Sequence, residues 1–298
     1  MSLRAKLVRL GLRLFFKRGT ARDIQAVRRR IARLGHLVPS APPETEVQHL
    51  DLDGVKAVRV ATRESRDDRH VLYLHGGGHV AGAPVLYRDF IWRIAAATRA
   101  RVTIIDHRLA PEHPFPAALD DAVATYRAML TDGVDPRRLA IMGESAGGGL
   151  VFSTLLALRD QGTRLPAAAV ALSPWTDLAL TGESLRRNAK ADPMLRADEA
   201  PLMAGYYLSG IDPRTPYASP LYGDPSGFPP TLIQVGSDEI LLDDSVRMAE
   251  RMRAAGCRVE LEIGKGMPHA WQLWARIMPE ARAAIARIGA FVQSNVQA

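Results

Sequence analysis

A series of short apolar runs, most of them separated by segments that can form helices, constrains the fold of this chain more than any other feature. The runs are mostly continuous in their apolar residues, which predicts strands buried on both faces of a sheet. Strands that alternate with helices are typical of a mainly parallel sheet covered by helices. We therefore expect an α/β fold with strands at 70–75, 102–106, 139–142, 168–172, 231–235 and 259–263.

An alternating pattern precedes these runs. Apolar and polar residues alternate in 47–52 and again in 55–60, on either side of Asp53-Gly54. An Asp-Gly connection between two alternating runs is the strongest short-range hairpin signal. We therefore expect an antiparallel hairpin at one edge of the sheet.

The composition is that of an ordinary globular protein, with 298 residues, 47% hydrophobic and 24% charged. This length fits one large domain, or a domain with a smaller lobe. No apolar run approaches the ~20 residues needed to cross a bilayer. Arg and Lys interrupt the start of the chain, so we expect no secretory signal. The single cysteine, Cys257, cannot form an internal disulfide, which fits a cytoplasmic protein.

The net charge of +7 is concentrated at the start of the chain. Residues 1–33 hold eleven Lys or Arg and one acid, Asp23, whereas the remaining residues have a small acidic excess. No zinc-finger, RNP or helix-turn-helix pattern accompanies the basic segment. Nucleic acid is therefore not an expected partner.

Apolar residues in this basic segment recur at helical spacing. Two interpretations follow: a helical lid that packs its leucines onto the body of the protein, or a basic helix that lies on an anionic membrane surface. We expect the lid, because most amphipathic stripes face a protein core. The stripes are Leu3, Leu7, Leu10 and Leu14, and then Ile24, Val27, Ile31 and Leu34.

A G-x-S-x-G motif centred on Ser145 lies between the apolar run 139–142 and a helix-compatible segment. Strand, sharp turn and helix are the context in which such a serine becomes a nucleophile. Gly143 and Gly147 remove side chains that would collide with the neighbouring strand and helix. The N–H groups at the start of the helix point toward any developing negative charge.

Three glycines follow His75, at the end of another buried run. This HGGG pattern is typical of the loop that supplies an oxyanion hole in esterases and lipases, because glycines leave backbone N–H groups unobstructed. His75 and His79 have the i, i+4 spacing of zinc ligands, but the glycines between them make a helix there unfavourable. We therefore expect neither a metal nor a cofactor.

A serine nucleophile also needs a base and an acid that orients the base. His269 lies in a loop just after 259–263, and Asp238 ends the run 231–235. The chain order Ser145, Asp238, His269 is that of α/β-hydrolases. Glu239 is the rival for the role of the acid.

Together these motifs resemble the bacterial hormone-sensitive-lipase-type esterases of the α/β-hydrolase superfamily. The resemblance covers the chain from about residue 45. It rests on 75–78, 106–118, 143–148, 173–178, 236–241 and 268–269.

The resemblance implies an eight-stranded, mostly parallel sheet. The catalytic core would be 45–177 and 216–298, and a helical cap would comprise 1–44 and 178–215. It implies Ser145 as nucleophile, His269 as base and Asp238 as orienting acid. The oxyanion donors would be the N–H groups of Gly77, Gly78 and Ala146.

The expected function is a serine carboxylesterase that hydrolyses short-chain carboxylic esters through an acyl-enzyme. A lactone hydrolase or deacetylase with the same triad is the alternative, and a non-catalytic ligand receptor is a third. Such a fold is also compatible with a homodimer. The expected substrate-binding residues are His79, Leu178, Met203, Tyr206, Tyr207 and Trp271. His79 and Glu144 depart from the family pattern, which usually has an aromatic residue and an aspartate there.

Overall fold

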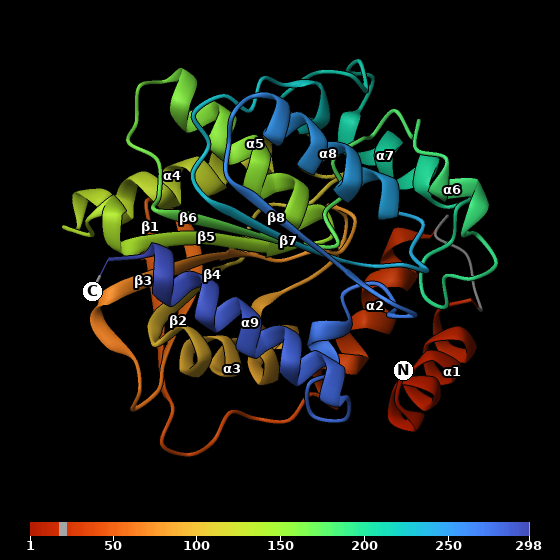
Figure 1. Ribbon diagram of the computed structural model, residues 1–298, viewed down its shortest axis with the longest axis horizontal. Helices are drawn as coiled ribbons and strands as arrows, with labels where there is room; N and C mark the ends of the chain where they lie inside the picture. Colours follow the sequence, from red (N-terminus) through yellow and green to blue (C-terminus); the bar gives the residue numbers. More distant parts are fainter. Residues whose placement is uncertain (18–22, 298) are drawn as a thin grey trace.

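The computed structural model describes residues 1–17 and 23–297, and it contains one eight-stranded sheet (Figure 1). The strand order is β1-β2-β4-β3-β5-β6-β7-β8. β1 pairs with β2, and β2 with β4, in antiparallel fashion, and every other pair is parallel. The predicted mostly parallel sheet with an antiparallel hairpin at one edge is confirmed. The strands are β1 (Glu46–Leu52), β2 (Val55–Ala61), β3 (Arg66–Leu74), β4 (Ala100–Ile105), β5 (Leu139–Glu144), β6 (Ala168–Leu172), β7 (Thr231–Gly236) and β8 (Val259–Gly264).

The central strands are buried on both faces, as their continuous apolar sequences predict. Along β3, Val71 and Tyr73 pack into one hydrophobic cluster, and Leu72 and Leu74 into the cluster on the other face of the sheet. All four side chains are fully buried. Successive residues of a strand point to opposite faces, so an unbroken apolar run serves two cores at once.

Helices cover both faces of the sheet. α3 (Arg88–Thr98) and α9 (Pro279–Asn295) lie on one face, and α4 (Ala117–Thr131), α5 (Ala146–Asp160) and α8 (Leu242–Ala254) on the other (Figure 1). Short 3-10 turns lie between them. These are η1 (Pro84–Tyr87), η2 (Pro136–Arg138), η3 (Pro220–Tyr222) and η4 (Trp271–Trp274).

The remaining helices gather at one end of the sheet, on the right in Figure 1. They belong to the two segments predicted to form a cap. Side chains of the first segment form hydrogen bonds with the backbone of the second. Arg9 donates to the carbonyl oxygen of Ala191, and Arg13 to that of Lys190 at 3.1 Å. The helices are α1 (Leu3–Phe16), α2 (Ile24–Gly35), α6 (Ser184–Arg187) and α7 (Ala200–Leu208).

The prediction that the first leucine stripe packs onto the protein is wrong. α1 buries Ala5, Val8 and Leu12 against the body, whereas Leu3, Leu7, Leu10 and Leu14 are all exposed. Small and branched residues between the leucines therefore make the contact, and the leucines lie on the outer side of the helix. In α2, by contrast, Ile24 is buried and Val27 and Ile31 pack against the core. The side chain of Leu34 lies outside the described residues.

No helix within residues 1–17 and 23–297 is both long and apolar enough to cross a membrane.

Close packing of α9 on α3 generates a stability prediction. A Cβ added at Gly289 of α9 would come 2.4 Å from the carbonyl oxygen of Ala97. Because that neighbour is backbone, we expect Gly289→Ala to lower the free energy of unfolding by ~1–3 kcal/mol. Urea denaturation monitored by circular dichroism measures the change.

Gly205 of α7 is the matched control, since nothing lies within 4 Å of an added Cβ there. Gly205→Ala should be neutral or raise the free energy of unfolding by ~0.5–1 kcal/mol, because alanine favours the helix. A Gly289→Ala protein as stable as the Gly205→Ala protein would contradict the close packing.

Candidate active site

Ser145 occupies the sharp turn between β5 and α5. Its φ of 56° and ψ of −125° form a strained conformation that residues other than glycine seldom adopt. A Cβ on Gly147 would lie 2.1 Å from the carbonyl oxygen of Leu74, and one on Gly143 would lie 2.4 Å from that of Gly147. The two glycines are therefore required by close backbone contacts. They allow the half-buried Ser145 to stand at the carboxyl end of the sheet.

The loop after β3 also depends on its glycines. A Cβ on Gly77, whose φ is +116°, would lie 1.8 Å from the carbonyl oxygen of Ala81. One on Gly76 would lie 2.3 Å from a carboxylate oxygen of Glu144 and 2.9 Å from Cβ of Ser145. The glycine loop therefore lies directly against the serine turn. The structure thus brings the loop that carries Gly77 and Gly78 against the turn that carries Ser145 and Ala146.

Glu144 holds the glycine loop and the serine turn together. Its carboxylate accepts hydrogen bonds from the hydroxyls of Tyr73 and Tyr87, each at 2.7 Å, and from the N–H of Gly76 at 2.6 Å. Burial raises the pKa of Glu144 to about 7, against the opposite effect of these hydrogen bonds. The sequence analysis singled out neither tyrosine, because each lies far from Glu144 along the chain.

The base candidate, His269, is paired with Glu239. Its Nδ1 lies 2.8 Å from Oε2 of Glu239, and both side chains are almost fully buried. The other oxygen of Glu239 accepts hydrogen bonds from the Ser173 hydroxyl at 2.7 Å and from the N–H of Gly236 at 2.5 Å. Both carboxylate oxygens are thus satisfied, as burial of a charged group requires.

The assignment of Asp238 as the orienting acid needs correction. Its carboxylate forms an ion pair with Arg9 at 2.8 Å and accepts a hydrogen bond from the Ser237 hydroxyl at 2.8 Å. Its side chain is 28% exposed, whereas that of Glu239 is fully buried. Beyond β7 the chain turns, and the Glu239 carboxylate folds back over Gly236, where an added Cβ would lie 3.0 Å away. The glycine at 236 leaves room for the longer acid.

The charge of Glu239 determines the state of the imidazole. Burial alone would lower the pKa of His269, but the hydrogen bond to Glu239 and its negative charge outweigh burial and raise the pKa above 6.5. With Nδ1 bound to Glu239, Nε2 is the ring atom left to exchange protons. The charges of Glu144 and His269 also act on one another's pKa.

The loop that carries His269 and the serine turn meet at the end of β6. The N–H of Ala270, next to His269, donates to the Ser173 hydroxyl at 3.1 Å. The N–H of Ser145 donates to the carbonyl oxygen of Leu172 at 2.8 Å.

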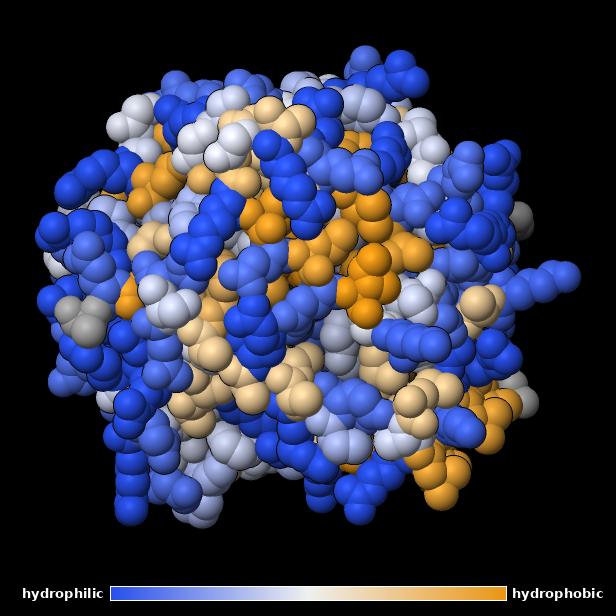
Figure 2. Space-filling view, viewed as in Figure 1, coloured by the Kyte–Doolittle hydropathy of each residue, from blue (hydrophilic) through white to orange (hydrophobic). Residues whose placement is uncertain are grey.

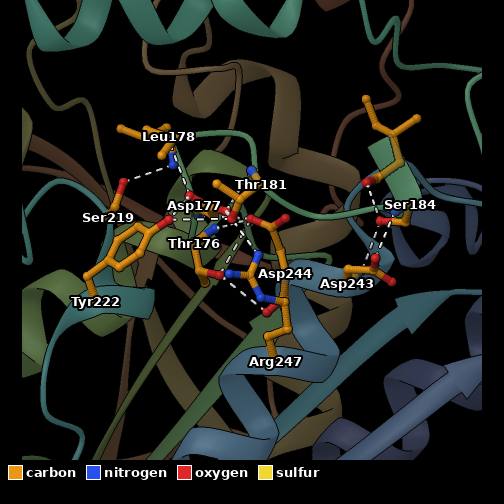
Figure 3. Close-up of polar contacts among 12 residues, drawn as sticks. Thr176, Asp177, Leu178, Thr181, Ser184, Ser219, Tyr222, Asp243, Asp244 and Arg247 are labelled. Atoms are coloured by element: carbon orange, nitrogen blue, oxygen red, sulfur yellow. Dashed lines mark hydrogen bonds and ion pairs between the residues drawn. The ribbon is translucent and has the colours of Figure 1, made fainter. Parts of the chain in front are cut away.

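The loop after β6 forms a hydrogen bond with the backbone of the serine turn. The N–H of Trp175 donates to the carbonyl oxygen of Ser145 at 2.9 Å. The next two N–H groups, of Thr176 and Asp177, donate to Oδ2 of Asp244 at 2.8 and 2.9 Å (Figure 3). Helix α8, which carries Asp244, thereby fixes the loop against the turn of Ser145.

The two segments predicted to form a cap fix the loop that carries Glu239. Asn188 donates to the carbonyl oxygen of Glu239 at 2.8 Å, and the N–H of Ile240 donates to Asp192 at 3.0 Å. Arg9 of α1 binds Asp238 and also donates to the carbonyl oxygen of Gly266, at 2.8 Å, in the loop that leads to His269. These positioning residues escaped the sequence analysis because they bind backbone groups rather than form a motif.

Three of the predicted substrate-binding residues lie together beside the glycine loop. The His79 imidazole stacks on Tyr207 with ring centroids 3.7 Å apart. Met203 lies one turn before Tyr207 in α7, and its sulfur lies 3.6 Å from the position of a Cβ on Gly78. His79 is buried, and burial lowers its pKa to about 3, so the ring is neutral at ordinary pH.

The other three predicted substrate-binding residues are Trp271, Leu178 and Tyr206. Trp271 packs into the hydrophobic cluster on the face of α3 and α9, away from the cluster that holds Met203 and Tyr207. Leu178 is buried, and its N–H donates to the Ser219 hydroxyl at 2.8 Å (Figure 3). Tyr206 is half-buried and packs against the cluster that holds Tyr207.

The two histidines with the spacing of zinc ligands, His75 and His79, contact different groups. Nδ1 of His75 lies 2.8 Å from the carbonyl oxygen of Gly76, whereas His79 stacks on Tyr207. Within the part of the chain that the structure describes, no group of three or more His, Cys, Asp or Glu side chains could hold a metal ion.

Residues 71–273 match the model of a family with the α/β-hydrolase fold. The chain therefore belongs to the α/β-hydrolase family. It is 44% identical over 229 residues to an acetyl-hydrolase of Streptomyces hygroscopicus. The aligned residues cover 77% of this chain and 77% of the relative. It is 36% identical over 253 residues to an esterase of Acinetobacter venetianus, covering 85% of this chain and 83% of the relative.

Solved structures place the chain more narrowly. A crystal structure of an esterase from the bacterial hormone-sensitive lipase family superposes with a TM-score of 0.96 and 42% sequence identity. The match covers 100% of this chain and 99% of the other. The resemblance to bacterial hormone-sensitive-lipase-type esterases is confirmed.

The contrast between the two buried histidines is testable by NMR. We expect the His269 imidazole to titrate with a midpoint above 6.5, because Glu239 stabilises its charged form. The His79 imidazole should stay neutral between about pH 5 and pH 8, since burial disfavours its charged form. A pH titration of the imidazole resonances, assigned with His→Gln variants, measures both.

Glu239→Gln is the control for this titration. It removes the negative charge but keeps a hydrogen-bond acceptor, so the midpoint of His269 should fall. A His269 midpoint that stays the same in this variant would show that Glu239 does not set the state of the base.

Proposed function

We propose that this protein is a serine carboxylesterase in which Ser145 is the nucleophile, His269 the base and Glu239 the orienting acid. The observation that carries the proposal is the buried pair of Glu239 and His269, 2.8 Å apart, at the sheet end that carries Ser145. A base held by an acid, next to a serine in a strained turn, is the arrangement that activates a hydroxyl for attack.

The proposed reaction has two halves. Nε2 of His269 removes the proton of the Ser145 hydroxyl as the oxygen attacks the ester carbonyl carbon. The tetrahedral intermediate then collapses, the bond to the alcohol oxygen breaks, and His269 returns the proton to the leaving alcohol. Water attacks the acyl-enzyme in the same way and releases the acid. Because the neutral imidazole is the base, hydrolysis should fall as the pH drops through the pKa of His269.

The negative charge of the intermediate would be stabilised by N–H groups of Gly77, Gly78 and Ala146. The close contacts of the glycine loop with Glu144 and Ser145 support this role, because they hold the donors in place before the substrate arrives. Removal of one such donor typically costs ~3–4 kcal/mol of transition-state stabilisation.

Small esters are the proposed substrates. Relatives named acetyl-hydrolase and esterase favour a short acyl group. His79, Met203 and Tyr207 would line the acyl or alcohol site, with cap residues narrowing it. A lactone hydrolase or deacetylase would use the same residues, and a non-catalytic receptor on this fold remains the third candidate. The lone Cys257 favours action in the cytoplasm.

Ser145→Ala is the first test of this function. It should lower kcat for a p-nitrophenyl ester by ~10⁶-fold, because the catalytic groups act as a unit. The native protein should be labelled by a fluorophosphonate at Ser145, and mass spectrometry of the peptide locates the label. A receptor would take no label, and turnover retained by pure Ser145→Ala protein would refute the assignment.

The two adjacent acids give a matched pair of variants. Glu239→Ala should lower kcat by ~10⁴-fold, because His269 loses the group that orients it and stabilises its charged form. Asp238→Ala should lower kcat by less than ~10-fold, since it removes a partly exposed ion pair with Arg9. Steady-state kinetics on one ester compares them. The reverse order of effects would restore Asp238 as the acid.

A further inference from the structure

The outer face of α1 presents a row of large apolar side chains to solvent. Leu3, Leu7, Leu10 and Leu14 are 73%, 60%, 55% and 50% exposed. Their spacing of three and four residues puts all four on one stripe of the helix. We call these four residues the leucine stripe. Single exposed leucines are common on protein surfaces, but a continuous row of them marks an interaction site.

The leucine stripe is fixed in its outward orientation. Ala5, Val8 and Leu12 are buried on the opposite side of the helix, so the face toward the protein is already occupied. Contacts near both ends prevent rotation: the Ser2 hydroxyl binds Glu280 at 2.9 Å, and Lys17 donates to the carbonyl oxygen of Leu195. The stripe therefore faces outward, and the helix cannot turn it toward the part of the protein that the structure describes.

Basic residues flank the stripe on both sides. Arg4 lies on one side of it, and Lys6 and Arg13 lie on the other, as the helical repeat requires, and all three are exposed. No acid precedes Asp23 in the sequence. Figure 2 shows the same arrangement, with a hydrophobic patch over α1 at the lower right, bordered by hydrophilic residues.

We propose that the leucine stripe docks α1 onto an anionic lipid membrane surface. The helix would lie in the plane of the interface, with its leucines among the lipid chains and its basic residues at the headgroups. Charge and apolar contact act together in such binding, and each basic residue near an anionic surface strengthens it about fivefold. The proposal does not depend on the esterase function.

Charge complementarity favours a membrane over a second copy of the chain. Two stripes that pack together would bring Arg4, Lys6 and Arg13 of one helix close to those of the other. Like charges at short range oppose such a contact, and the helix carries no acid to offset them. An anionic surface, in contrast, binds the leucines and the basic residues at the same time.

Vesicle cosedimentation of the full chain tests the proposal. The intact protein should bind vesicles of an equal mixture of phosphatidylglycerol and phosphatidylcholine, and should not bind pure phosphatidylcholine vesicles. Leu7→Gln/Leu10→Gln should weaken binding by ~10-fold or more, because two apolar side chains no longer enter the lipid. Arg4→Gln/Lys6→Gln should weaken it to a similar degree.

Val47→Gln/Ile211→Gln is the matched control, since it removes two exposed apolar side chains far from α1 in the sequence. It should bind as the intact protein does. Circular dichroism and thermal unfolding verify that each variant folds, and hydrolysis of a water-soluble p-nitrophenyl ester should be unchanged in all of them.

Three results would overturn the proposal. The first is no binding of the intact protein to the anionic vesicles. The second is full retention of vesicle binding by the Leu7→Gln/Leu10→Gln variant, which would show that binding depends on charge alone. The third is a dimer in sedimentation equilibrium that Leu7→Gln/Leu10→Gln abolishes, without vesicle binding, which would make a second copy the partner.

Discussion

Two buried glutamates, one on each side of the turn that carries Ser145, are the constraint on which the rest of the site depends. Each carboxylate accepts three hydrogen bonds, and all of them except the one from Gly236 come from groups far from it in the sequence. Glu144 binds the glycine loop to the serine turn, and Glu239 binds the end of β7 to the imidazole of His269. A buried carboxylate without such donors would be costly, so each one holds its loop in a single arrangement. The parallel sheet brings the strand ends together, and the glutamates fix the side chains there.

The topology and the positions of Ser145 and His269 could be predicted from the sequence, because they depend on local patterns. Buried strands need continuous apolar runs, and a serine in a strained turn needs glycines on both sides. The acid could not be predicted with the same certainty. Asp238 and Glu239 are adjacent, and the choice between them depends on the backbone turn after β7 and on the space above Gly236. Those are properties of the folded chain.

The face that a helix buries is equally hard to read from sequence. The leucines of α1 form the more hydrophobic stripe, yet Ala5, Val8 and Leu12 make the contact with the protein. Polar contacts determine which face of α1 is buried. Arg9, for example, binds Asp238 and the carbonyl oxygen of Gly266. These contacts link the start of the chain to the loops that carry Glu239 and His269. The same helix thus has an inner face that supports the site and an outer face that is free to dock.

A crystal structure of the protein after reaction with a p-nitrophenyl phosphonate tests the central claim most directly. The account predicts phosphorus bonded to Oγ of Ser145, its oxygen within hydrogen-bond distance of the glycine-loop N–H groups, and Nδ1 of His269 still on Glu239. Phosphorus on another residue, or an imidazole that has turned to Asp238, would contradict it.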